Sequence, residues 1–225
     1  MTELDLLRLL QLADSALPIG AAAHSFGLET LTAEEVVGPA QLRAFIRDYL
    51  DEAGMLEAVA CRAAFAGADF AGVNEDVNEV LSATKQARES RVASAALGKR
   101  FLRLVFDVCG NRRLAEALET AEIRAGEIHS SPAFGLAGAV LGLDEEAVVA
   151  ACLRSMVAAM VSAAQRLLPL GQTAASILLW ESNVAIASLV ERSRGVTLAD
   201  ACCFAPMLDC ASMRHPGLST RLFIS

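Results

Sequence analysis

Residues Ala147–Gln172, AVVAACLRSMVAAMVSAAQRLLPLGQ, decide the fold. At about 100° per residue, the polar side chains of this segment fall within about 120° of one another. The rest of the helical surface is apolar, so the helix must be covered on most sides. It is therefore either the central helix of a helical domain or, in part, an oligomer interface. Pro169 ends the helix, because it lacks an N–H group and disfavours helical geometry at Leu168. The polar stripe comprises Arg154, Ser155, Ser162, Gln165 and Arg166.

The composition favours helices. The chain has 225 residues, of which 54% are hydrophobic and only 5% are aromatic. Apolar residues that are mostly Ala, Leu and Val are typical of closely packed helices rather than of a β-sandwich. We therefore predict an all-α, single-domain bundle of about 8–10 helices over residues 1–214. Residues 215–225 lack a helical pattern and are expected to form a flexible C-terminal tail.

Several helix ends are marked by local signals. Pro39, at a first-turn position, is expected to open a long helix that runs to about Ala66. Asp144 is a suitable N-cap for the central helix. A second apolar helix is predicted over residues 173–192, after the Pro169 break.

The net charge of −8 argues against a broad nucleic-acid surface. The charge is unevenly distributed, because residues 1–80 carry 14 acids and 4 bases, whereas residues 81–113 carry 8 bases and 2 acids. Such asymmetry suits docking to other proteins. The basic segment is either a docking face for an acidic partner or a solvated helix face. Its bases are Lys85, Arg88, Arg91, Lys99, Arg100 and Arg103.

The N-terminal sequence predicts a cytoplasmic protein that lacks a signal peptide, because Glu3 and Asp5 stand where a basic region would be needed. Arg154 and Glu181 interrupt the two longest apolar runs, so no membrane span is expected. The six cysteines lack paired spacing and indicate reduced thiols. We expect Cys61, Cys109 and Cys152 to be buried as small hydrophobic residues, and to a lesser extent Cys202 and Cys203.

The common catalytic motifs are missing. The sequence has no phosphate-binding Gly-x4-Gly-Lys-Ser/Thr loop, no His-Glu-x2-His and no Gly-x-Ser-x-Gly. Ser82 and Lys85 match a Ser-x-x-Lys nucleophile pattern, but the companion motifs of that class of enzyme are absent. A second alternative is a carrier that binds nickel directly through Cys202, Cys203 and His215.

Five segments, taken in order, resemble the urease accessory protein family UreF. They are Leu9–Gly20 with His24–Glu29, Ala87–Arg91, His129–Gly135, Leu167–Gln172, and Arg214–His215 with Arg221–Phe223. Each segment alone is a weak signal, whereas the ordered set is specific and covers nearly the whole chain.

The resemblance implies an all-helical homodimer with no enzymatic activity and no cofactor. Proteins of this family bind UreD, also called UreH, and then recruit and regulate the GTPase UreG. The assembly inserts nickel into the urease apoprotein. The resemblance therefore implies an adaptor in urease maturation, with nickel as cargo rather than as a resident metal.

The resemblance also places candidate partner-binding residues. Glu29 and Arg166 are candidates for communication with the GTPase, and the segment Arg214–Ser225 is a candidate for the UreD contact. Glu29 has a local alternative as a helix cap or salt-bridge residue, and Arg166 as a charge that complements the dipole at a helix C-terminus. The other candidates, within the family segments, are Arg88, Arg91, Gln172, Arg214, His215, Arg221, Leu222 and Phe223.

Overall fold

The computed structural model describes residues 1–68, 71–123 and 126–224, and within these ranges the chain is helical without strands. A π-helical turn, Leu50–Gly54, joins α3 to α4, so these two segments form one continuous helix. Counted in this way, ten helices lie within the described ranges, as the sequence predicts. The elements are α1 (Glu3–Leu12), η1 (Ala21–Ala23), α2 (Leu28–Ala33), α3 (Leu42–Tyr49), α4 (Met55–Ala66), α5 (Ala71–Thr84), α6 (Arg88–Cys109), α7 (Arg112–Ile123), α8 (Ser130–Val140), α9 (Glu145–Leu167), α10 (Gln172–Arg192), α11 (Pro206–Arg214) and η3 (His215–Gly217).

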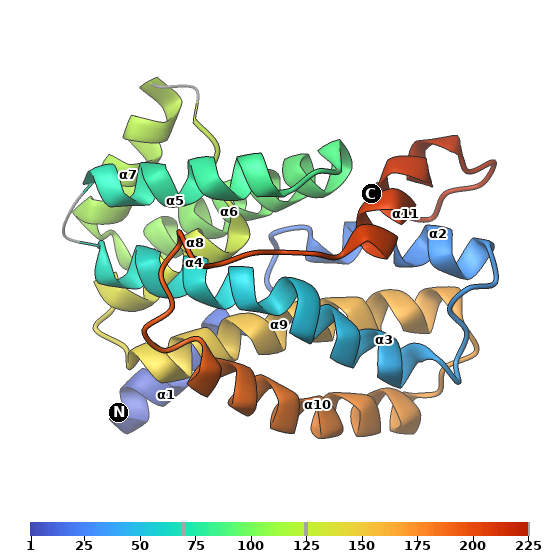
Figure 1. Ribbon diagram of the computed structural model, residues 1–225. Helices are drawn as coiled ribbons and strands as arrows, with labels where there is room; N and C mark the ends of the chain where they lie inside the picture. The colour runs from blue at the N-terminus through green and yellow to red at the C-terminus, as the bar shows by residue number, and fades with distance from the viewer. Residues whose placement is uncertain (69–70, 124–125, 225) are drawn as a thin grey trace.

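Helix α9 runs through the middle of the molecule (Figure 1). It packs against α10, α8 and α4, and one end also meets α2 and η1. Its apolar surface is covered, so the prediction of a central helix is confirmed. Arg166 is the exposed member of its polar stripe, whereas the other four side chains are half-buried. The buried residues include Val148, Val149, Leu153, Val157, Met160 and Val161.

Small residues allow α8 to lie very close to its neighbours. Helix α8 has the sequence SSPAFGLAGAV and packs on both α4 and α6. A Cβ atom at Gly135 would lie 2.0 Å from the carbonyl oxygen of Cys61 on α4. Any larger residue at position 135 would therefore push α8 away from α4, which is the most extensive helix contact of the fold.

Local signals placed most helix ends correctly. The Asp144 side chain accepts a hydrogen bond from the backbone N–H of Ala147 at 2.9 Å, so the predicted N-cap of α9 is confirmed. Leu168 is extended and ends α9 before Pro169. The prediction for Pro39 is wrong, because residues 39–41 form a turn and α3 begins at Leu42.

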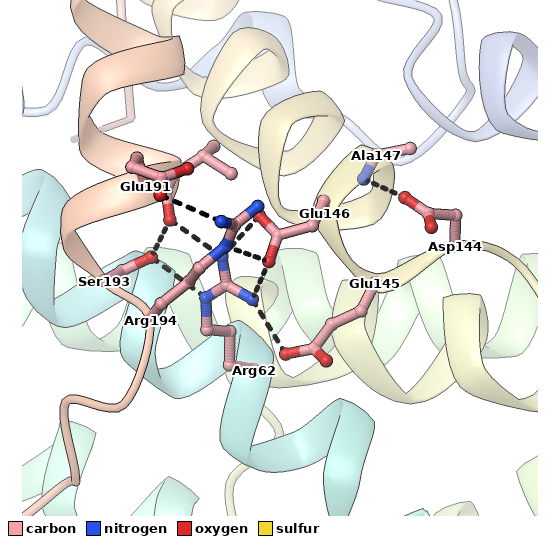
Figure 2. Close-up of polar contacts among 9 residues, drawn as sticks. Arg62, Asp144, Glu145, Glu146, Ala147, Glu191, Ser193 and Arg194 are labelled. Atoms are coloured by element: carbon pink, nitrogen blue, oxygen red, sulfur yellow. Dashed lines mark hydrogen bonds and ion pairs between the residues drawn. The ribbon is translucent and has the colours of Figure 1, made fainter.

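A buried arginine joins the ends of three helices (Figure 2). Arg62 on α4 contacts Glu145 at 2.9 Å and Glu146 at 2.8 Å in the first turn of α9. Its guanidinium group also donates to the Ser193 hydroxyl at 2.9 Å and to the Val190 carbonyl at 2.8 Å, at the end of α10. Because Arg62 is almost fully buried, these acceptors are what make its charge tolerable inside the protein.

Two helices, α9 and α10, are long and apolar enough to cross a membrane when judged by length and composition. Half of the most apolar part of α9 is buried within the fold, so its hydropathy is that of a core helix. In α10 that share is 22%, and the exposed face carries a large apolar stripe. The stripe is formed by Ile177, Trp180 and Val184.

Replacement of Arg62 by Met should destabilise the fold strongly. The change removes the charged donor of Glu145, Glu146 and the Ser193 hydroxyl, and the expected loss is about 3 kcal/mol in the free energy of unfolding. Arg43→Met removes an exposed ion pair with Glu181 and should cost less than about 1 kcal/mol. Urea denaturation of both variants measures the difference, and equal losses would contradict this role for Arg62.

The loss of unfolding free energy caused by Arg62→Met should also depend on pH. Hydrogen bonds from Arg62 lower the pKa of Glu146 to about 2 from an ordinary value of 4.5. A carboxylate whose pKa is depressed by folding contributes stability above pH 4.5 and loses that contribution as the pH falls towards 2. The difference in free energy of unfolding between wild type and Arg62→Met, measured by urea denaturation, should therefore become smaller as the pH falls from 7 to 3. A gap that stays constant would show that the ion pair with Glu146 contributes nothing.

Candidate functional site

The C-terminal residues Leu218–Ile224, here called the strap, lie against α2 and the end of α9. The strap follows α11 and η3, and it contains no helix of its own. The Phe223 side chain is buried, whereas Leu222 and Ile224 are 56% and 69% exposed. The backbone N–H of Ile224 donates to the Ala23 carbonyl in η1 at 2.8 Å. The expected tail therefore has a defined position, with Phe223 buried between two exposed side chains.

Glu29 is the buried anchor of the strap. Gly27, with φ +87°, allows the chain to turn into α2, and a Cβ atom there would lie 3.1 Å from the Leu208 carbonyl of α11. This turn places Glu29 in the first turn of α2 with only 4% of its surface exposed. Its two carboxylate oxygens accept the backbone N–H groups of Leu222 at 2.6 Å and Phe223 at 3.2 Å.

His215 lies between two carboxylates. Its Nε2 atom is 2.8 Å from Glu29 on α2, and its Nδ1 atom is 2.8 Å from Glu89 on α6. The imidazole ring is fully buried. Three segments that are far apart in sequence therefore meet at one ring.

Arg166 covers the strap from the end of α9. Its guanidinium carbon lies 4.2 Å from the centre of the Phe223 ring, a cation–π arrangement. One terminal nitrogen donates to the Ala22 carbonyl of η1, and the other approaches the Leu222 carbonyl at 3.5 Å. Arg166 lies in the last turn of α9 as expected, and its side chain also contacts the strap directly.

Arg214 ties the end of α11 to α2. It forms two hydrogen bonds of 2.7 Å with the Glu34 carboxylate. These hydrogen bonds hold the pKa of Glu34 below its ordinary value of 4.5 and raise that of Arg214. The pair is half-exposed, so it contributes orientation more than stability.

The structure brings six of the ten predicted partner-binding residues together. Arg88 is exposed at the start of α6, next to Glu89, and Arg221 is exposed on the strap. Arg91 turns back to the Lys85 carbonyl at 2.9 Å, and Gln172 pairs with Gln165 at 3.0 Å, so neither joins the cluster. The six that meet are Glu29, Arg166, Arg214, His215, Leu222 and Phe223.

The Ser82 and Lys85 pattern does not form a nucleophile pair. The Lys85 ammonium group is bonded to the buried carboxylate of Glu57 on α4. Burial alone would raise the pKa of Glu57, but Lys85 and a hydrogen bond from Ser131 bring it below the ordinary value. The Ser82 hydroxyl faces Glu127 and His129 instead. Lys85 therefore acts as the counter-ion of Glu57.

The cysteines are arranged differently from the prediction. Cys61 and Cys152 are buried as expected, but Cys109 is exposed because it is the last residue of α6. Cys202 is also exposed and Cys203 is half-buried, because both lie in the irregular segment before α11. Among the residues that the structure describes, no three His, Cys, Asp or Glu side chains are placed to hold a metal ion.

Sequence reasoning missed Glu89 and the carbonyl groups of Ala22 and Ala23. Glu89 is the only acid between Lys85 and Arg103, and this isolation was a signal that it has a specific partner. Backbone carbonyl groups leave no trace in the side-chain pattern, so nothing in the sequence singles out Ala22 or Ala23. The assembled corner presents an arginine and two exposed apolar side chains, on a strap whose backbone is hydrogen-bonded to α2 and η1.

Comparison with known proteins identifies the family of the chain. The sequence profile of the UreF family matches residues 36–183. The chain is 33% identical over 219 residues to the urease accessory protein UreF of Corynebacterium glutamicum (strain R), covering 96% of each chain. It is also 33% identical over 232 residues to UreF of Geobacillus kaustophilus (strain HTA426), covering 100% of each. A third relative, UreF of Arthrobacter sp. (strain FB24), is 34% identical over 226 residues, covering 97% of this chain and 96% of the relative. The chain therefore belongs to the UreF family of urease accessory proteins.

Proposed function

We propose that this protein is a cytoplasmic adaptor in urease maturation, which binds UreD/UreH and recruits and regulates the GTPase UreG during nickel insertion into the urease apoprotein. Membership of the UreF family makes it a non-catalytic urease accessory protein. The observation that carries the finer proposal is the cluster of Glu29, Arg166 and the strap at one corner of the fold.

The strap suits a protein partner because its backbone is fixed while apolar side chains on either side of Phe223 point outwards. Leu222 and Ile224 are both largely exposed, and Arg166 lies beside them. A preordered segment loses little conformational entropy on binding, and arginine is one of the residues enriched in binding hot spots. We assign this face to UreD. Arg166, which contacts both the strap and η1, is the candidate for coupling to UreG.

The exposed stripe on α10 supports a homodimer. Ile177, Trp180 and Val184 follow one another at helical spacing, and Trp180 is 78% exposed. In a dimer with a twofold axis, the apolar stripe of one subunit packs against the same stripe of the other. Most homodimers bury such surfaces in this way. We propose that two α10 helices pack together in this way.

A direct nickel carrier is the weaker alternative. It needs His215 to act as a ligand together with Cys202 or Cys203, but both ring nitrogens of His215 face carboxylates of this chain. Nickel would therefore have to displace Glu29 or Glu89 before it could bind to this histidine. The adaptor needs no such rearrangement.

The strap proposal predicts that Leu222→Asp combined with Ile224→Asp abolishes UreD binding while the fold stays intact. Both side chains point outwards, so the hydrogen bonds of the strap to Glu29 and Ala23 are kept. Co-purification from cells that express both proteins measures the complex. The loss expected is at least about tenfold, since two apolar contacts are replaced by charges.

Val108→Asp is the matched control, because Val108 is 65% exposed on α6, outside the strap. This variant should capture UreD as wild type does. If the protein with both strap substitutions captures as much UreD as wild type does, the assignment of this face to UreD is wrong.

The dimer proposal predicts that Trp180→Asp converts the free protein to monomers, because a charge in the middle of the stripe would be buried unpaired. Sedimentation velocity across a concentration series measures the mass. Val108→Asp should sediment like wild type. If the Trp180 variant has the same oligomeric state as wild type at every concentration, the α10 interface is wrong.

A further inference from the structure

Both nitrogens of the fully buried His215 ring face a carboxylate oxygen at 2.8 Å, Nε2 towards Glu29 and Nδ1 towards Glu89. A neutral imidazole has one N–H donor and one lone pair. A neutral ring between two ionised carboxylates would therefore point its lone pair at an oxygen that also has only lone pairs. Such a contact is repulsive, and the His215 ring is fully buried, although the Glu89 side chain is 23% exposed.

The arrangement is satisfied only if the cluster holds one additional proton. Either the ring is an imidazolium that donates to both carboxylates, or one carboxyl group is protonated and donates to a neutral ring. The proton count is the same in both cases. We infer that Glu29, His215 and Glu89 form a proton-dependent latch that holds the strap, and that the strap is released as the pH rises.

The latch controls the strap because the two share Glu29. The carboxylate that faces His215 also accepts the N–H groups of Leu222 and Phe223. Loss of the proton leaves Glu29, His215 and Glu89 with a repulsive contact, which is relieved when the segment that carries His215 moves away. The hydrogen bonds to the strap are then lost with it.

The direction of the pH effect follows from the proton count. A released, hydrated histidine loses its proton at about pH 6.5. Above that pH, docking of the strap has to take up a proton from solution. The docking equilibrium should then fall by about tenfold for each pH unit.

The other charged groups around the latch are constant charges or are bonded elsewhere. Arg214, on the preceding residue, is paired with Glu34 of α2, and Arg166 of α9 lies over Phe223. Arginine stays charged at all relevant pH values. Burial raises the pKa of Asp209 on α11, and its carboxylate is bonded to the backbone of Ala87. Arg88, beside Glu89 on α6, and Arg221 on the strap are likewise constant positive charges.

The test is hydrogen exchange of the C-terminal peptide in the full-length protein between pH 6 and pH 9, read by mass spectrometry. After correction for the intrinsic exchange rate, protection of the Leu222, Phe223 and Ile224 amides should fall by about tenfold per pH unit above about pH 6.5. Protection that does not change over this range would overturn the latch.

Glu89→Gln is the decisive variant. A glutamine amide can donate to the lone pair of Nδ1 while Nε2–H donates to Glu29, so the neutral ring is satisfied and no additional proton is needed. This variant should keep the strap docked with pH-independent protection. Glu34→Gln is the matched control, since it removes a neighbouring carboxylate that bonds Arg214 rather than His215. In Glu34→Gln, strap protection should fall with pH as steeply as in wild type. If strap protection in Glu89→Gln also falls as steeply as in wild type, the proposal is contradicted.

The ¹⁵N shifts of the imidazole rings provide a second reading that does not depend on exchange. The chain has only three histidines. Burial lowers the pKa of His129 to about 4 and also lowers that of His24 from 6.5, so both are neutral at pH 7.5. The expected result is that His215, or a carboxyl group beside it, loses a proton over the same pH range in which the strap amides lose protection. A fully neutral His215 at pH 6.5, with the strap still docked and both carboxylates ionised, would refute the latch.

Discussion

The buried carboxylate of Glu29 is the constraint on which the corner of the fold depends. An ionised group inside a protein is tolerated only when hydrogen-bond donors surround it. Glu29 finds them in two N–H groups of the strap and in His215, which are separated from it by 186 to 194 residues. Helix α2, α11 and the strap must therefore take up their positions together. Arg62 performs the equivalent task at the far end of α9, where it holds the ends of α4, α9 and α10.

The helical part of the fold was predictable because its signals are local. The apolar surface of α9, its cap at Asp144 and its end at Leu168 follow from residues within a few positions of one another. The position of Cys109 was mispredicted, since an apolar periodicity does not show that the last turn of a helix extends beyond the core. Pro39 likewise marks a turn just before the helix, because its fixed φ suits both positions.

The site was only half predictable, for a different physical reason. Family resemblance and residue type singled out Glu29, Arg166 and the C-terminal residues, and for Glu29 the alternative to a partner contact was a local helix cap or salt bridge. Glu29 instead bonds to His215 and the strap, 186 to 194 residues away in the sequence. A periodic sequence pattern does not show that a helix pairs with an irregular segment nearly the whole chain away. The strap shows how such pairing separates two tasks. Its backbone and Phe223 hold it in place, whereas Leu222 and Ile224 remain available to a partner.

We propose that Glu29, although buried, shapes the surface that we assign to UreD. The most direct measurement is made on one protein, Glu29→Gln, by comparing exchange of the strap amides with affinity for UreD. The substitution keeps the size of the side chain but removes its charge and turns an amide donor towards groups that also donate. We predict that strap protection and UreD affinity fall together, even though residue 29 has almost no exposed surface. Lost protection with undiminished affinity for UreD would show that UreD binding does not depend on Glu29.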